Sequence, residues 1–191
     1  LGCGSQPPAN HRTLGLRHAA SAEQAYRLGS YSAAAHSFEQ ALRHLRAADD
    51  PQAVARLLHN HAVALMAWQD CAAASGYLYE AAALNERLAQ PRQRAVNLLA
   101  LAGCQRQNGD GAGATRTLIL AAELAAKAGD KATAARAQAG LGAISTSAGD
   151  LAGAAKAYAE AERLAEAAAD PGALALVHNN LGRLHARQGA H

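Results

Sequence analysis

Aromatic residues are scarce in this chain of 191 residues. Phe, Trp and Tyr together make up 4% of it, although hydrophobic residues as a whole reach 50%. A core must therefore be built mainly from Ala and Leu, which implies close packing of small side chains. The 18 Lys and Arg are spread along the chain without a basic run. Nucleic-acid binding is not predicted, because it needs a clustered basic patch and usually stacking aromatics.

The sequence also lacks the common signatures of catalysis and of membrane spans. No apolar stretch approaches the roughly 18 residues that cross a bilayer. There is no glycine-rich phosphate loop of the Walker type, no Gly-x-Ser-x-Gly elbow and no His-Glu-x-x-His helix. Acidic residues are scattered, without an obvious inward pair. The sequence therefore predicts that the chain is not an enzyme and uses no cofactor.

Histidines are present, but their spacing does not favour a metal site. His59 and His61 lie two residues apart, so on a helix they point to nearly opposite sides. His61 stands where other repeats carry leucine, which predicts a packed histidine with a satisfied hydrogen bond. His178 and His185 share a helix face, yet two imidazoles without a third ligand are weak support for metal binding. We predict no metal site.

A pattern with a step of 40 residues dominates the chain. Two columns of helix-starting residues follow this step: Ser30, Asp70, Asp110 and Asp150, and Asp50, Gln90, Asp130 and Asp170. Small and large apolar positions keep the same register: Ala34, Ala74, Ala114 and Ala154; Ala41, Ala81, Ala121 and Ala161; Phe38, Leu78, Leu118 and Tyr158; and Ala22, Ala62, Ala102, Gly142 and Gly182. Two helix starts in each repeat and a fixed period predict an all-α solenoid.

The stretch from Ala137 to Ala168 shows the unit most clearly. Gly149 can take the left-handed conformation that ends one helix, and the Asp150 carboxylate can accept from the N–H groups that open the next. With Leu141-Gly142 before the turn, and Ala154, Tyr158 and Ala161 after it, this stretch resembles a tetratricopeptide repeat (TPR). The resemblance covers the chain from about Leu14 to its end.

The resemblance implies a right-handed α-α superhelix of about four helix pairs plus one extra helix. The standard repeat of the family has about 34 residues, whereas this one steps by 40, as in long-period members such as kinesin light chains. We expect the extra residues to lengthen the second helix and the link to the next repeat. The expected boundaries are a flexible lead at 1–13 and a repeat domain at 14–191, divided at about 14–49, 50–89, 90–129, 130–169 and a partial 170–191.

The resemblance also implies where a partner binds. In the family, the first helices of successive repeats line a concave groove, and an asparagine before the Leu-Gly pair bonds the backbone of an extended peptide. Asn60 and Asn180 hold that position here. The same surface includes Arg56, Val63, Met66, Arg106, Arg136, Asn179 and Arg183. Arginine and asparagine favour an acidic or extended peptide of a protein partner. The alternative is that Arg56, Arg106 and Arg136 are solvated helix residues without a partner.

The first residues carry a different signal. Leu1-Gly2-Cys3 resembles the end of a bacterial lipoprotein signal, and a polar, proline-containing stretch follows it. The resemblance implies a lipid on Cys3 as the membrane contact of the chain, at the periplasmic face of the outer membrane. In the alternative, Cys3 is a free cysteine in a disordered end, and the repeats are a regulatory segment of a larger cytosolic sensor or enzyme.

Two further cysteines lie within the repeats. Cys71 begins a second helix and Cys104 lies late in the first helix of the next repeat, so neighbouring helices could bring them together. A disulfide requires Cα atoms about 4.4 to 6.8 Å apart, and an oxidising periplasm permits it. The alternative is a pair of small buried thiols.

Overall fold

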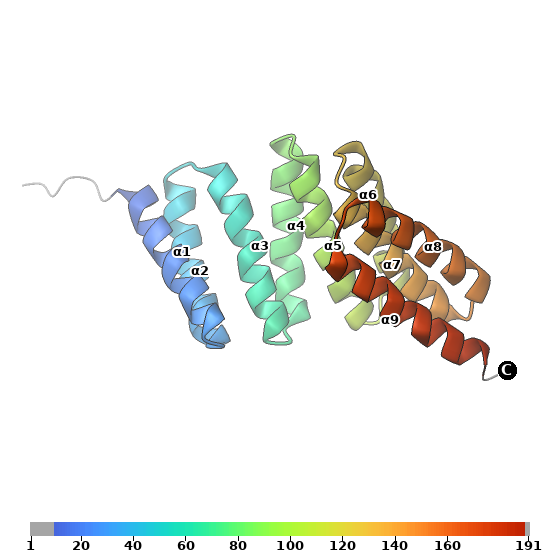
Figure 1. The fold of residues 1–191 in the computed structure, drawn as a ribbon. Coiled ribbons are helices and arrows are strands. Elements are labelled where there is room, and N and C mark those ends of the chain that lie inside the picture. The colour runs from blue at the N-terminus through green and yellow to red at the C-terminus, as the bar shows by residue number, and fades with distance from the viewer. Residues whose placement is uncertain (1–9, 190–191) are drawn as a thin grey trace, which may run out of the picture. The chain divides into compact units, whose positions relative to one another are not determined.

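The computed structural model describes residues 10–189, and within them the chain is all-α (Figure 1). The described residues form nine helices: α1 (His11–Arg27), α2 (Tyr31–Ala47), α3 (Pro51–Ala67), α4 (Cys71–Arg87), α5 (Pro91–Gln107), α6 (Gly111–Lys127), α7 (Lys131–Ala148), α8 (Leu151–Ala167) and α9 (Pro171–Gln188). A new helix begins every 20 residues, so a helix pair fills the 40-residue step of the sequence.

The lengths of the helices and links within the 40-residue step differ from the expectation. Both helices of a pair have nearly the same length, since α1 to α6 and α8 have 17 residues each and α7 has 18. The links between them have three residues each, except for two between α7 and α8. The prediction of a longer second helix and a longer inter-repeat link is therefore wrong, because first and second helices share the extra residues.

The first helix also begins earlier than the predicted boundary at residue 14. It starts at His11, because the Asn10 side chain accepts a hydrogen bond from the Thr13 amide at 3.2 Å. Asparagine is among the best residues at this position, since its short side chain reaches the free N–H groups of the first turn.

Each link contains one residue in the left-handed region. Glycine occupies this position at Gly29, Gly109, Gly129 and Gly149, with φ between 67° and 84°. Four other links hold the same conformation with a side chain: Asp49, Gln69, Ala89 and Ala169, with φ between 49° and 63°. A left-handed residue ends a helix by directing the chain away from the helix axis. The expected role of Gly149 is confirmed by its φ of 84°.

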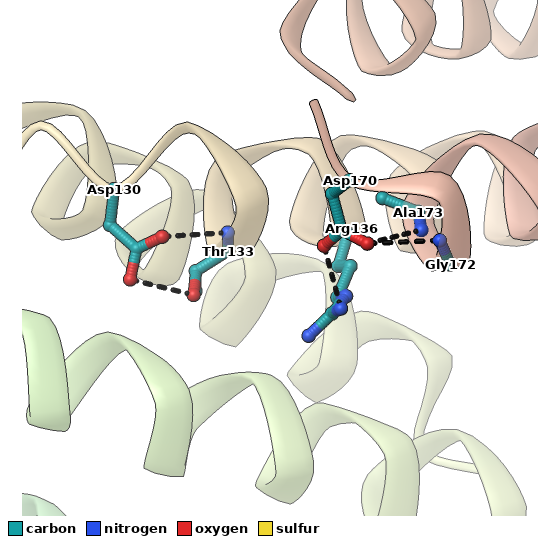
Figure 2. Close-up of polar contacts among 6 residues, drawn as sticks. All are labelled: Asp130, Thr133, Arg136, Asp170, Gly172 and Ala173. Atoms are coloured by element: carbon teal, nitrogen blue, oxygen red, sulfur yellow. Dashed lines mark hydrogen bonds and ion pairs between the residues drawn. The ribbon is translucent and has the colours of Figure 1, made fainter. Parts of the chain in front are cut away.

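Aspartate carboxylates open most of the helices that follow. Asp130 accepts from the amide and hydroxyl of Thr133 at 3.1 and 3.0 Å, and Asp170 accepts from the Gly172 and Ala173 amides at 3.0 Å each (Figure 2). The same kind of cap occurs at Asp50, Asp70, Asp110 and Asp150. Ser30 and Gln90 hold the N-cap positions of α2 and α5 as predicted, but neither side chain makes a cap hydrogen bond.

The helices divide into two compact units at Leu84 and Asn85, within α4. In unit 1, α2 packs on both α1 and α3, around a core of Phe38, Leu42, Leu45 and Leu58 with buried alanines. In unit 2, α6 packs on α5 and α7, α8 packs on α7 and α9, and α7 also contacts α5 and α9. First helices of neighbouring pairs therefore lie next to each other in unit 2, as the TPR resemblance implied.

The small-residue columns are buried as the period predicted. The eight alanines of the two columns in the second helices are all 0% exposed, and Phe38, Leu78, Leu118 and Tyr158 are at most 4% exposed. Gly142 permits a close helix contact, since a Cβ there would lie 2.6 to 2.9 Å from the Tyr158 ring. Gly182, in the same column, is exposed and a Cβ there would meet nothing within 4 Å. The core thus depends on small residues, but not at every position of the column.

The non-glycine left-handed residues predict a stabilising substitution. Ala169→Gly should raise the free energy of unfolding by about 0.5 to 1 kcal/mol, because relief of the left-handed strain exceeds the added entropy of the unfolded chain. Urea unfolding of the complete chain measures the change. The neighbouring Ala168, with φ of −92°, is the matched control, and Ala168→Gly should give no gain. Equal effects of the two substitutions would contradict the assignment of strain to residue 169.

Candidate functional site

Unit 2 contains a hollow of about 570 Å³ that runs along the first helices α5, α7 and α9. Five of the residues predicted for the groove line it: Arg106, Arg136, Asn179, Asn180 and Arg183. They come from three helices that are adjacent in space but 30 to 77 positions apart in the sequence. The structure therefore gathers the predicted residues of these repeats into one site, which we call the groove.

The floor of the groove is apolar and made of short side chains. Alanines from all three first helices line it, together with Leu99, Leu118 and Leu176. Leu176 is 43% exposed although it is a large apolar residue. Gly103 and Gly140 place backbone without a side chain at the same surface. A floor of this kind accepts a chain with small or apolar side chains close to the helix backbones.

The rim of the groove is basic. Among the residues that line it, none is Asp or Glu. Arg136 is held by the Asp170 carboxylate at 2.7 Å, and the same carboxylate caps α9 (Figure 2). Arg106 and Arg183 are exposed, and their side chains make no ion pair or hydrogen bond with any residue that the structure describes. Two guanidinium groups thus face the groove without a countercharge, which favours an anionic ligand.

Asn180 adds a side-chain amide to the same surface of the groove. Its side chain is only 9% exposed, and it lines the groove without a hydrogen bond to the described residues. Buried polar side chains are normally hydrogen-bonded. A carboxamide left open toward a groove can both donate to and accept from the backbone of a bound chain.

A smaller hollow of about 220 Å³ adjoins the groove, and we call it the side hollow. Arg106, Ala143, Asn180 and Arg183 line both spaces. The side hollow is completed by Thr146, Ser147, Tyr158, Ala186 and Arg187. Arg187 donates a hydrogen bond to the Thr146 carbonyl near the end of α7. The groove and the side hollow therefore form a continuous basic surface on unit 2.

Solved structures share this arrangement of helices. A structure of aspartyl phosphate phosphatase F from Bacillus subtilis matches with a TM-score of 0.80 at 12% identity, over 90% of this chain and 45% of that one. A Rap protein in complex with competence and sporulation factor matches with a TM-score of 0.73 at 16% identity, over 95% of this chain and 55% of that one. The chain thus spans about half the length of these two proteins.

A third match comes from Podospora anserina, a kinesin light chain with nearly identical TPR-like repeats. It has a TM-score of 0.73 at 16% identity, over 96% of this chain and 90% of the other. The chain has a TPR-like helical-repeat fold. At these identities the likeness shows the fold alone. No protein-family model matches the sequence, and neither does any curated protein.

The remaining predicted groove residues lie on α3, in unit 1. Arg56 is exposed, whereas Val63 and Met66 are partly buried. Asn60 donates to the Glu23 carboxylate at 3.4 Å, a long hydrogen bond to α1. Asn60 is therefore engaged within its own unit, unlike Asn180. The hollow found near the first turn of unit 1 is lined by 29–33, His36, Ser37 and Trp68, and none of the four predicted residues contributes to it.

Sequence reasoning missed the floor of the groove and most of the side hollow. The signal was present in the 40-residue step, because Leu176 occupies the column of Arg136, and Thr146 occupies the column of Arg106. The predicted set included the apolar Val63 and Met66 on α3, but only arginines and asparagines on α5, α7 and α9, so the apolar and small members of these columns were left out. Arg187 lies one helical turn after Arg183 and has no counterpart in the predicted set.

Two of the three cysteines lie within the described residues. Cys71 and Cys104 are both buried, 4% and 0% exposed, and a disulfide between them stays a prediction. Cys3 lies outside the described residues. Within residues 10–189 no group of three or more His, Cys, Asp or Glu is placed to hold a metal ion. None of the described helices is long and apolar enough to span a bilayer.

His61 is packed as predicted, but its expected hydrogen bond is absent at one nitrogen. The side chain is 1% exposed, and its ring lies between Phe38 and Tyr77, with centroids 5.6 and 4.2 Å away. Its Nδ1 has no hydrogen-bond partner among the described residues. Burial lowers the pKa of His61, against a smaller opposing effect of the Glu39 carboxylate. The folded protein therefore resists protonation of this ring.

This lowered pKa predicts a loss of stability in acid. Below a pH of about 6.5 the unfolded chain gains a proton at residue 61 that the folded chain resists, so unfolding becomes more favourable. His61→Leu should remove this contribution. The free energy of unfolding of this variant, relative to that of the original protein, should therefore rise as pH falls from 7 to 5, by at most about 1.4 kcal/mol per pH unit. Urea unfolding across this range measures the difference. The exposed His36 is the control; equal slopes for His36→Leu and His61→Leu would contradict the account.

Proposed function

We propose that this chain is a non-enzymatic interaction scaffold whose groove in unit 2 binds an extended acidic segment of a protein partner. The observation that carries the proposal is the combination of Arg106, Arg183 and Asn180, all without a partner in the described protein, above an apolar floor. Among the described residues, the guanidinium charges have no carboxylate beside them, and the Asn180 amide has no hydrogen-bond partner. An acidic peptide supplies carboxylates for the two arginines and backbone groups for the Asn180 amide.

Each part of the groove has a distinct role in this binding. The forked guanidinium groups of Arg106 and Arg183 bind carboxylates through paired hydrogen bonds. The Asn180 amide pairs with a backbone peptide group and so favours an extended segment. Arg136 is already fixed by Asp170, whose carboxylate offsets its charge, so it borders the groove in a fixed position and leaves the unpaired positive charge to Arg106 and Arg183. The charge of the rim sets the preference for acidic peptides. The alanine floor limits the size of the peptide side chains that point toward the floor.

The structural comparisons support a binding role. One matching structure is a Rap protein in complex with competence and sporulation factor, so a TPR-like protein of similar helix arrangement accepts a partner. Solenoids of this type present long concave surfaces built from successive repeats. The groove of unit 2 lies on the first helices, which form the concave surface in the family that the sequence resembles.

We further propose that Cys3 carries a lipid that anchors the scaffold at the periplasmic face of a bacterial outer membrane. The support is the Leu1-Gly2-Cys3 sequence and the polar residues that follow it. Two acyl chains on one residue are enough for stable anchoring, whereas a single chain is marginal. In the alternative, the scaffold belongs to a larger cytosolic sensor or enzyme, and Cys3 has no special role.

The groove proposal is tested with an array of short synthetic peptides of graded acidity and constant length. The complete chain should bind the Glu-rich members most tightly, and binding should weaken as salt is added. Arg106→Gln combined with Arg183→Gln should lower the affinity for the acidic peptides by about tenfold or more, which is the loss of one or two charge-assisted hydrogen bonds.

Arg116 provides the matched control for this experiment. It is an exposed arginine on α6 that does not line the groove. Arg116→Gln removes one positive charge from the same unit but should leave peptide affinity nearly unchanged. Equal binding of neutral and acidic peptides, or an equal loss in the control and the double variant, would refute the groove assignment.

The anchoring proposal is tested by metabolic labelling with a fatty acid in cells that express the complete gene. The original protein should incorporate label and sediment with membranes. The Cys3→Ser variant should lose both properties, because serine lacks the thiol that accepts the first acyl group. Absence of label from both proteins would remove the lipoprotein interpretation and favour the cytosolic alternative.

A further inference from the structure

The side hollow concentrates positive charge beyond what the groove requires. Arg106 from α5 and Arg183 and Arg187 from α9 all line it, and no Asp or Glu does. Arg183 and Arg187 lie four residues apart, so they share one face of α9. Like charges gathered around a small space repel one another unless an anion lies between them. The side hollow therefore favours a ligand with more negative charge than the groove alone.

The neutral polar groups of this hollow are already satisfied within the protein. Thr146 Oγ1 donates to the Gly142 carbonyl at 2.8 Å and lies 3.3 Å from the Tyr158 hydroxyl. Ser147 Oγ donates to the Ala143 carbonyl at 3.0 Å. The groups left to a ligand are thus the arginines and the Asn180 amide. This set is rich in N–H donors, as an anion with several oxygens requires.

Arg187 is the residue that distinguishes the side hollow from the groove. It lines the side hollow only. Among the described residues its side chain bonds to the neutral Thr146 carbonyl, so its charge is not balanced by a carboxylate there. That hydrogen bond fixes the guanidinium beside the end of α7 and leaves its other N–H groups for a ligand. A guanidinium held in this way is well suited to an oxyanion.

We propose that the side hollow binds a phosphoryl group carried by the segment that occupies the groove. The inference rests on the groove binding proposed above. A phosphoryl group carries a charge of about −1.5 to −2 at neutral pH and three acceptor oxygens, against one charge for a carboxylate. Arg106, Ala143, Asn180 and Arg183 border both spaces. A group attached to a bound segment can therefore reach the side hollow without leaving the groove.

The test uses fluorescent peptides of alternating Ala and Glu, in which each Glu is replaced in turn by phosphoserine. The complete chain should bind one or two of the phosphorylated peptides about tenfold more tightly than the parent, through one or two added charge-assisted hydrogen bonds. This gain should shrink between pH 7.5 and 5.5, because the phosphoryl group has a second pKa of about 6 and loses charge in that range. Fluorescence anisotropy measures both effects.

The variants assign the effect to the side hollow. Arg187→Gln should bring the ratio of phosphorylated to parent affinity close to one, and Arg187→Lys should keep only part of the gain, since lysine retains the charge but loses the fork. Arg116→Gln, outside both spaces, should keep the full ratio. Thermal unfolding of each variant identifies any loss of structure at the end of α7 that would itself weaken binding.

The outcomes separate this inference from the groove proposal. Two results would overturn the phosphoryl site and leave the groove proposal standing. One is binding of the Glu peptide without any gain from phosphoserine, and the other is an equal loss of affinity for the parent and the phosphorylated peptides in Arg187→Gln. Failure of every peptide to bind would overturn both. Inorganic phosphate is the third probe: competition with the phosphopeptide alone supports the site, whereas tighter binding of free phosphate than of the phosphopeptide would make the anion an independent ligand and overturn the inference.

Discussion

The structure depends on the short links between helices, each of which combines a left-handed residue with a helix-starting residue. Every link between α1 and α9 contains a positive φ, whether or not the residue is glycine. In most links the following aspartate accepts the amides of the next helix. This combination stops each helix after nearly the same number of residues. Within unit 2, equal helices bring α5, α7 and α9 to one surface, where the groove forms.

The capping aspartates also connect first helices to one another. Arg12 pairs with Asp50 at 3.0 Å within unit 1, and Arg136 pairs with Asp170 at 2.7 Å within unit 2. Exposed ion pairs of this kind contribute little stability, about 0 to 1 kcal/mol. Their role is to orient arginines relative to the next repeat, whereas stability comes from the alanine columns, which let helix backbones approach. Because Asp170 already holds Arg136, the arginines without a partner are those free to bind a ligand.

Periodicity predicted the fold well because each column reports one physical requirement. Small residues mark close helix contacts, and Asp marks a helix start, so the all-α solenoid and most caps followed from the sequence. The helix lengths did not follow from the sequence. Half of the left-handed positions that end helices are held by Asp49, Gln69, Ala89 and Ala169, which are not glycine and give no sequence signal. The polar groove residues of unit 2 were predicted from a resemblance, but the side hollow was not, since Arg187 and Tyr158 meet only through packing of α8 and α9.

Amide and methyl NMR spectra of the complete chain, titrated with a Glu-rich extended peptide, test the central claim most directly. Alanine methyl groups line the groove floor at Ala102, Ala139, Ala143 and Ala175, whereas Ala121 and Ala161 are buried residues of α6 and α8 that do not line it. The account predicts that shifts concentrate on the floor methyls and the Asn180 side-chain amide. Shifts that concentrate on α6 and α8 and spare the floor would contradict it.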